Sequence, residues 1–121
     1  ETGTSALVII EGLTMYLSEA DVKRIFAVIS GRFDRVTVLV ETMNPMVVRR
    51  FREKSIEASR AKFRWGVKDG AALAALLPDF RLVEEHSLCE GMAEFAPVYR
   101  LLDKIPAVRN ISNRIVVLEK K

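Results

Sequence analysis

The feature that most constrains the fold is a run of five consecutive apolar residues, Ala6–Ile10, followed directly by Glu11 and Gly12. A strand with one face in water alternates polar and apolar side chains, whereas a strand covered on both faces is apolar throughout, as in parallel sheets. We therefore predict that Ala6–Ile10 is a buried parallel strand. Because such a strand needs neighbours on both sides, we also expect the chain to be the later part of a larger domain.

The residues after this strand predict a strand, helix, strand unit. Ser18 and Asp21 form a capping signal for a helix over Glu19–Ser30, whose apolar residues recur at i, i+3, i+4 and i+7. Gly31 is a natural residue to end this helix. Arg35–Glu41 is rich in β-branched residues and predicts a second buried strand. Two strands joined through one helix by short connections are typical of a parallel sheet with a right-handed crossover.

The second half of the chain predicts two helices and two further strands. A charged helix is expected over Met46–Lys62, and Asp69 is placed to cap a short helix over Ala71–Leu77. Arg81–Leu88 and Arg114–Glu119 are expected to be strands that form a hairpin-like antiparallel edge. No repeat, linker or low-complexity segment divides the sequence. The predicted fold class is therefore a single α/β domain over residues 1–121.

Composition excludes several classes of protein. Half of the residues are hydrophobic and 29% are charged, which is enough apolar material for a packed core and argues against disorder. The single Cys89 can form neither an internal disulfide nor a multi-cysteine zinc site. The apolar runs are far shorter than the ~20 residues of a membrane helix, and no signal peptide is visible. We therefore expect a soluble, cytoplasmic protein with no membrane partner.

The usual catalytic and nucleotide-binding motifs are absent from the sequence. There is one histidine, His86, and the six glycines are too scattered for a G-x-S-x-G, P-loop or G-x-G-x-x-G motif. His86 lies beside Glu84 and Glu85, so we expect a half-exposed histidine paired with a carboxylate, with a general base as the alternative. Cys89 has no evident activating partner and is expected to be a small buried residue. No metal site and no catalytic side chain are predicted.

The most informative segment is Val8–Leu17 (VIIEGLTMYL). Glu11 lies at the carboxyl end of the predicted first strand, where ligands bind in open α/β sheets, and Gly12 permits a sharp turn after it. This segment, followed by FRWG at Phe63–Gly66 and RLVEEHSL at Arg81–Leu88, resembles in the same order the motifs of the leucine carboxyl methyltransferase family. That family uses S-adenosylmethionine and includes polyketide O-methyltransferases of the tetracenomycin type.

The resemblance implies a Rossmann-like class I methyltransferase sheet, of which residues 1–121 would be the C-terminal half, from the fourth strand to the last. In that family the glycine-rich loop, the ribose-binding acid and the adenine-contacting segment lie upstream of these motifs. The chain alone is therefore expected to be inactive and to bind S-adenosylmethionine weakly. If free, it is also expected to form a dimer or a larger species through its first strand.

The resemblance also implies which residues form the site. Glu11 and Gly12 are placed against the S-adenosylmethionine cofactor, and the substrate is expected to be a small molecule methylated on a carboxylate or hydroxyl oxygen. Four residues are expected beside that substrate: Met15, Tyr16, Phe63 and Trp65. The residues by themselves leave alternatives open. Glu11 could face water or cap the next turn, Tyr16 could be an ordinary half-buried aromatic, and the loop aromatics could fasten the loop to the sheet.

A basic stretch raises a second hypothesis. Seven basic residues and two acidic ones lie between Arg49 and Arg64, whereas the whole chain has a net charge of only +3. We expect a solvated helix face and no nucleic-acid binding, because few aromatic side chains are interleaved to stack on bases. The alternative function is a non-enzymatic interaction module that uses the helix over 46–62 to bind nucleic acid or an acidic partner. A third possibility is a methyltransferase-like domain that has lost cofactor binding.

Overall fold

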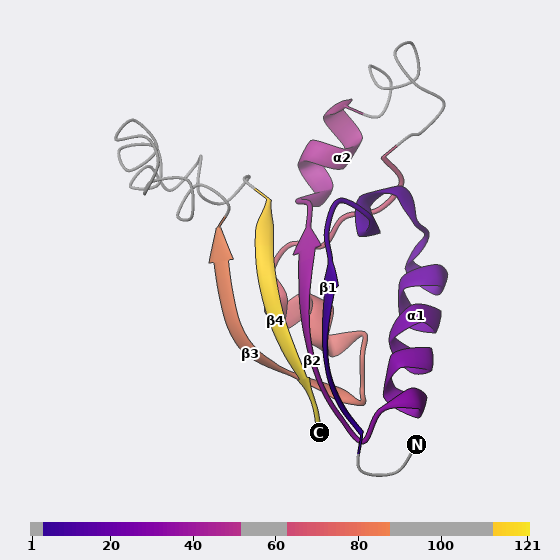
Figure 1. Ribbon diagram of the computed structural model, residues 1–121. Helices are drawn as coiled ribbons and strands as arrows, with labels where there is room; N and C mark the ends of the chain where they lie inside the picture. The colour runs from indigo at the N-terminus through magenta and orange to yellow at the C-terminus, as the bar shows by residue number, and fades with distance from the viewer. Residues whose placement is uncertain (1–3, 52–62, 88–112) are drawn as a thin grey trace.

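The computed structural model describes residues 4–51, 63–87 and 113–121 of the chain. These residues form one four-stranded mixed sheet in the order β1-β2-β4-β3 (Figure 1). β1 (Ser5–Ile10) and β2 (Arg35–Thr42) are parallel. β4 (Arg114–Lys120) lies between β2 and β3 (Phe80–Ser87) and is antiparallel to both. The predicted α/β class, the parallel first pair and the antiparallel edge pair are confirmed.

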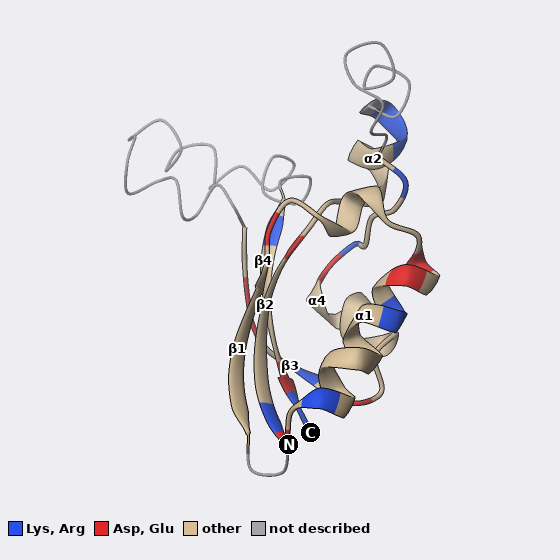
Figure 2. Cartoon of the chain, turned by 45° about the vertical axis from the view of Figure 1, so that its right-hand side comes forward, with Lys and Arg blue, Asp and Glu red and all other residues tan. Residues whose placement is uncertain are grey.

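Helices connect these strands. η1 (Thr14–Tyr16) and α1 (Glu19–Arg32) join β1 to β2, α2 (Pro45–Phe51) follows β2, and α4 (Gly70–Ala75) precedes β3. α1 and α4 lie on the same side of the sheet, and no described helix covers the other side (Figure 2). The predicted helix over 46–62 is described only in its first part, as α2, and the remainder lies outside the described residues.

The signals that start α1 and α4 act as predicted. The Ser18 hydroxyl oxygen accepts a hydrogen bond from the backbone N–H of Asp21 at 3.1 Å. The Asp69 carboxylate accepts one from the backbone N–H of Ala72 at 2.8 Å. Each bond satisfies one of the N–H groups that the first turn of a helix leaves without a partner.

The predicted end of the first helix at Gly31 is wrong. α1 continues through Gly31 to Arg32, and the backbone of Gly31 is not in the left-handed region. Lys120 supplies the reason, because its ammonium group donates to the carbonyl oxygens of Ser30 at 2.8 Å and Phe33 at 2.9 Å. A side chain from β4 thus satisfies carbonyls that a glycine turn would otherwise cap.

The hydrophobic core lies between the sheet and the two helices α1 and α4. Phe26 of α1 and Phe80 of β3 meet edge to face, with ring centroids 5.1 Å apart. Almost fully buried apolar side chains come from every layer: Val22, Phe26, Val38, Val40, Leu73, Val116 and Leu118. This core fixes the positions of β1 and β2, and with them the loops that follow the two strands.

β1 has one covered face among the described residues, whereas the sequence predicts two. Ala6 and Val8 pack against the core, but Leu7 and Ile9 alternate to the opposite face, where each is 63% exposed. β1 also lies at the edge of the described sheet, with β2 as its strand partner there. An apolar run indicates that a strand avoids water on both faces, but α1 can cover only one of them.

Candidate functional site

Two parallel strands end side by side, and the loops that follow them converge at one edge of the sheet. Ile10 pairs with Val40 in the register of β1 and β2, so Glu11 and Glu41 occupy the next position on each strand. We call this edge, formed by the carboxyl ends of β1 and β2, the carboxyl edge. Gly12 has φ 63° and turns the chain away from β1, a conformation that costs a glycine little. This part of an open α/β sheet is where ligands bind.

The Glu41 carboxylate connects three segments at the carboxyl edge. One oxygen accepts from the backbone N–H of Gly12 at 2.9 Å, and the other accepts from the side-chain amide of Asn113 at 2.8 Å. The hydroxyl of Thr14 donates to the backbone carbonyl of Glu41 at 2.8 Å. The sequence motifs do not identify Glu41 as a site residue. The available signal is that a glutamate directly follows the last buried apolar residue of each parallel strand, Ile10 and Val40, and the register brings the two glutamates to one edge.

Glu11 lies at the carboxyl edge with its side chain in the open. The residue is exposed, and no hydrogen bond or ion pair to it is found among the residues that the structure describes. It does not cap the following turn, because the carboxylate that accepts from Gly12 belongs to Glu41. Without a ligand, Glu11 could either face water or cap the next turn. The structure excludes the cap and leaves the carboxylate that faces water.

Two of the predicted substrate residues meet beside this turn. The rings of Tyr16 and Phe63 are tilted by 37° with centroids 5.3 Å apart. Tyr16 is 38% exposed, and Phe63 is partly buried against a small cluster of Met15, Met43 and Val48. The pair gives the carboxyl edge an aromatic surface that is open on one side. Stacked or tilted aromatic pairs of this kind offer apolar contact together with the polar hydroxyl of tyrosine.

The other two predicted substrate residues lie deeper. The Met15 side chain is only 3% exposed, and its backbone carbonyl accepts from the N–H groups of Arg64 at 2.7 Å and Trp65 at 3.4 Å. Trp65 is partly buried and packs against the main core. These contacts fasten the segment from Phe63 onward to η1. Met15 supports the aromatic pair through its cluster with Phe63, and the contacts of Trp65 match the alternative that the loop aromatics hold the loop to the sheet.

A polar row crosses the sheet one position further along, on the side that carries the helices. Thr42, Arg114 and Ser87 are register partners on β2, β4 and β3. Arg114 forms an ion pair with Glu85 at 2.9 Å, in which both side chains are about one fifth exposed. Within the described part of the chain, the Thr42 hydroxyl and the Arg114 Nε are buried without a hydrogen-bond partner. On the face of the sheet that the helices cover, the buried side chains are therefore polar at this edge, whereas those of the preceding rows are apolar.

His86 has the environment that the sequence predicts. Its Nε2 lies 3.4 Å from the Glu84 carboxylate, and the two side chains are 48% and 62% exposed. β4 and β2 separate β3, which carries His86, from the Glu11 turn. The prediction of a half-exposed histidine paired with a carboxylate is confirmed. Cys89 lies outside the described residues.

The basic stretch is described only at its beginning. Arg49 and Arg50 are exposed on α2, at the end of that helix that lies away from the sheet (Figure 2). α2 is held by Asn44, whose side chain accepts from the N–H of Met46 at 2.8 Å. The two exposed arginines fit the expected solvated face.

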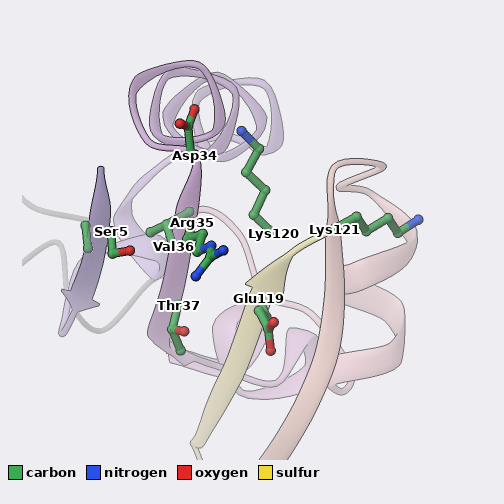
Figure 3. A pocket seen from close by; sticks show the side chains of 9 residues that line it. Ser5, Asp34, Arg35, Val36, Thr37, Glu119, Lys120 and Lys121 are labelled. Atoms are coloured by element: carbon green, nitrogen blue, oxygen red, sulfur yellow. The ribbon is translucent and has the colours of Figure 1, made fainter. Parts of the chain in front are cut away.

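A large hollow lies at the opposite end of the sheet. It measures about 590 Å³ and is lined by the first residues of β1 and β2 together with the end of β4 (Figure 3). Two of its charged side chains are already engaged, because Glu119 pairs with Arg81 at 2.8 Å and Lys120 binds the end of α1. Lys120 and Lys121 point in different directions and do not converge on a common point (Figure 3). The carboxyl edge remains the better candidate site.

Comparison with known proteins finds similarity to an O-methyltransferase. The chain is 31% identical over 97 residues to the tetracenomycin polyketide synthesis O-methyltransferase TcmP of Streptomyces glaucescens, an alignment that covers 77% of this chain and 36% of the relative. This chain thus spans about a third of the length of the relative that it matches. No protein-family model matches, and no solved structure matches. A distant relative of the chain is therefore an O-methyltransferase.

Two further properties hold for the residues that the structure describes. None of the helices there is long and apolar enough to cross a membrane. Over the same residues, no group of three or more histidine, cysteine, aspartate or glutamate side chains is arranged to hold a metal ion.

Proposed function

We propose that this chain is part of an S-adenosylmethionine-dependent O-methyltransferase that acts on a small molecule. The observation that carries the proposal is the exposed Glu11 carboxylate on the left-handed Gly12 turn, at the carboxyl ends of two parallel strands. The similarity to an O-methyltransferase supports the same reaction class. In this proposal the sheet is the C-terminal half of a Rossmann-like class I methyltransferase sheet of the leucine carboxyl methyltransferase type.

The described residues fit one side of such a cofactor site. An exposed carboxylate such as Glu11 can accept hydrogen bonds from hydroxyl or amino donors of the cofactor, and these bonds are stronger when the acceptor is charged. A Cβ built on Gly12 would meet no atom within 4 Å, so the backbone of the turn is open to close approach. When bound, S-adenosylmethionine supplies a methyl group on a positively charged sulfur. Glu11 and Gly12 would hold one side of the cofactor. The sequence contains no glycine-rich loop that could hold its other side.

The substrate in this proposal lies against the aromatic pair. The Tyr16 and Phe63 rings offer an apolar surface, and the exposed edge of Tyr16 brings a hydroxyl that can bind a polar group. Methyl transfer to oxygen depends chiefly on the alignment of the reacting atoms and on the exclusion of water. A site without a catalytic side chain is consistent with that requirement. The resemblance to the leucine carboxyl methyltransferase family is what suggests a carboxylate or hydroxyl oxygen as the methyl acceptor.

The proposal is tested by binding of S-adenosylmethionine to the full-length protein, measured by titration calorimetry. Replacing Glu11 by alanine should weaken binding by about 1–3 kcal/mol, because a charge-assisted hydrogen bond is lost. Glu84→Ala is the matched control, since it removes an exposed strand glutamate on β3, away from the edge. Equal affinity of the parent and Glu11→Ala proteins, with unchanged melting temperatures, would remove Glu11 from the site.

We also propose that the free 121-residue chain associates with a second copy through β1. The exposed face of β1 carries Leu7 and Ile9, and its outer edge pairs with no strand among those described. Unpaired backbone groups beside exposed apolar side chains favour pairing with another strand. A two-fold arrangement would let each copy cover the same strand of the other.

A further inference from the structure

We propose that Glu41 is a positioning residue of the candidate site, which fixes the turn that presents Glu11. This inference rests on the proposed function, because it assigns to Glu41 the task of preorganising the carboxylate that contacts the cofactor. It also adds a residue that neither the sequence motifs nor the similarity to TcmP identifies.

The geometry gives each oxygen of Glu41 one donor from a different segment. Gly12, at the exit of β1, donates its backbone N–H to one oxygen at 2.9 Å. Asn113, directly before β4, donates its side-chain amide to the other at 2.8 Å. The backbone of Glu41 adds a third link, since its carbonyl accepts from the Thr14 hydroxyl at 2.8 Å. One residue at the end of β2 therefore holds the exit of β1 and the entry of β4 in place.

The turn needs such a contact because glycine by itself does not fix it. Gly12 is exposed and has no side chain to pack, and glycine has the greatest conformational freedom of all residues. Glu11 precedes it directly, so a change in the Gly12 backbone redirects the Glu11 side chain. A ligand that binds an unfixed Glu11 must first order the turn, which lowers its affinity. The Gly12–Glu41 bond removes that cost before the ligand arrives.

The chemistry of the contact distinguishes two substitutions. Alanine at position 41 removes both acceptors. Glutamine keeps one carbonyl oxygen that accepts from the Gly12 N–H. Its side-chain NH2 group can donate to the side-chain oxygen of Asn113 after the Asn113 amide group rotates by about 180°. Glu41→Gln should thus restore the shape of the turn without the charge, whereas Glu41→Ala should not. Asn113→Ala removes only the second donor and leaves the bond to Gly12.

The experiment measures the turn and the ligand separately in the full-length protein. Hydrogen exchange of the Gly12 amide reports on its bond to Glu41, and calorimetry with S-adenosylmethionine reports on the site. We expect Glu41→Ala to lose protection at Gly12 and to weaken binding about tenfold. Glu41→Gln should recover most of both. The control Glu119→Ala, which breaks a strand-to-strand ion pair at the other end of the sheet, should change neither.

A double-mutant cycle separates positioning of Glu11 from a general effect on the fold. If Glu41 acts mainly through Glu11, adding Glu41→Ala to Glu11→Ala should cost clearly less than the roughly tenfold loss of Glu41→Ala alone, because only the contact of Gly12 then remains to be positioned. Fully additive losses, or an unchanged Gly12 amide in Glu41→Ala, would overturn the proposal. A parent protein that fails to bind S-adenosylmethionine while the Gly12 amide still responds to Glu41→Ala would overturn the proposed function, and would leave Glu41 as a structural contact only.

Discussion

The ammonium group of Lys120 lies 2.8 Å from the backbone carbonyl oxygen of Ser30, and so joins the last residues of β4 to the end of α1. A second bond of 2.9 Å runs to the carbonyl of Phe33. The positive charge also lies at the negative end of the helix dipole, where it is favourable. Through this one side chain, β4, which lies between β2 and β3, is bound to α1, the helix that covers β1 and β2.

Replacing Lys120 by methionine should destabilise the chain. The substitution retains most of the aliphatic stem but leaves the two carbonyls without their charged donor, at an expected cost of about 1–2 kcal/mol. Chemical denaturation followed by circular dichroism measures the difference. Lys121→Met is the control, because Lys121 is exposed at the next position. Similar stabilities for the two variants would show that the bonds to α1 contribute nothing.

Two glycines should respond in opposite ways to alanine. A Cβ on Gly66 would lie 2.5 Å from the Met43 carbonyl oxygen and 2.9 Å from the Pro45 nitrogen, both backbone atoms that cannot easily move. Gly66→Ala should therefore destabilise the chain by about 1–3 kcal/mol. A Cβ on Gly31 would meet nothing within 4 Å inside α1, so Gly31→Ala should stabilise it by about 0.5–1 kcal/mol. Thermal melting of both variants provides the comparison, and a neutral Gly66→Ala would contradict the close packing at the end of β2.

The aromatic pair should affect the substrate more than the cofactor. Tyr16→Ala removes the ring that contacts Phe63, and the loss of such a pair should raise KM for the methyl acceptor about two- to tenfold. Tyr16→Phe keeps the ring and tests the hydroxyl alone. S-adenosylmethionine affinity should stay the same in both variants. A change in cofactor affinity as large as the change in KM would place Tyr16 elsewhere in the site.

The amino-acid pattern predicts the strands and helix starts well, because the features that determine them lie within short stretches of sequence. Alternation, β-branched residues and the caps Ser18 and Asp69 are sufficient to predict the strands, their pairing directions and the helix starts. The end of α1 is not predictable in this way, because it depends on Lys120, which is 90 residues away in the sequence from Ser30. The face of β1 that no described segment covers is also not predictable in this way, because an apolar run does not show which segment covers it.

The same distinction applies to the site. Glu11 and Gly12 are adjacent in sequence and can be read from the motif alone. Glu41 belongs to the site through a bond that spans 29 positions, and Asn113 through one that spans 72. Such contacts follow from the strand register, which the sequence does not give directly. Whether Glu11 and Gly12 hold the cofactor remains a prediction.

The exposed arginines of α2 should not be needed for methyl transfer. Charge reversal of Arg49 and Arg50 to glutamate should leave the kcat/KM for a small methyl acceptor within about twofold of the parent value, because exposed charges interact weakly at physiological ionic strength. Filter binding of RNA at several salt concentrations provides the second measurement. Tight, salt-sensitive RNA binding by the parent that the double variant loses would favour the interaction-module hypothesis instead.

The free chain should sediment as a dimer or larger species at micromolar concentration. Leu7 and Ile9 are each 63% exposed on one face of β1, and the outer edge of that strand has no partner among the described strands. Replacing both residues by lysine places two like charges on the same strand of each copy, which opposes close pairing without affecting the core on the opposite face. The variant should therefore shift to monomer in analytical ultracentrifugation while its thermal stability changes little. Arg81→Glu on β3 is a surface control that leaves β1 intact and should not change the distribution. A parent chain that remains monomeric, with a cooperative thermal transition, would overturn the proposal that β1 associates.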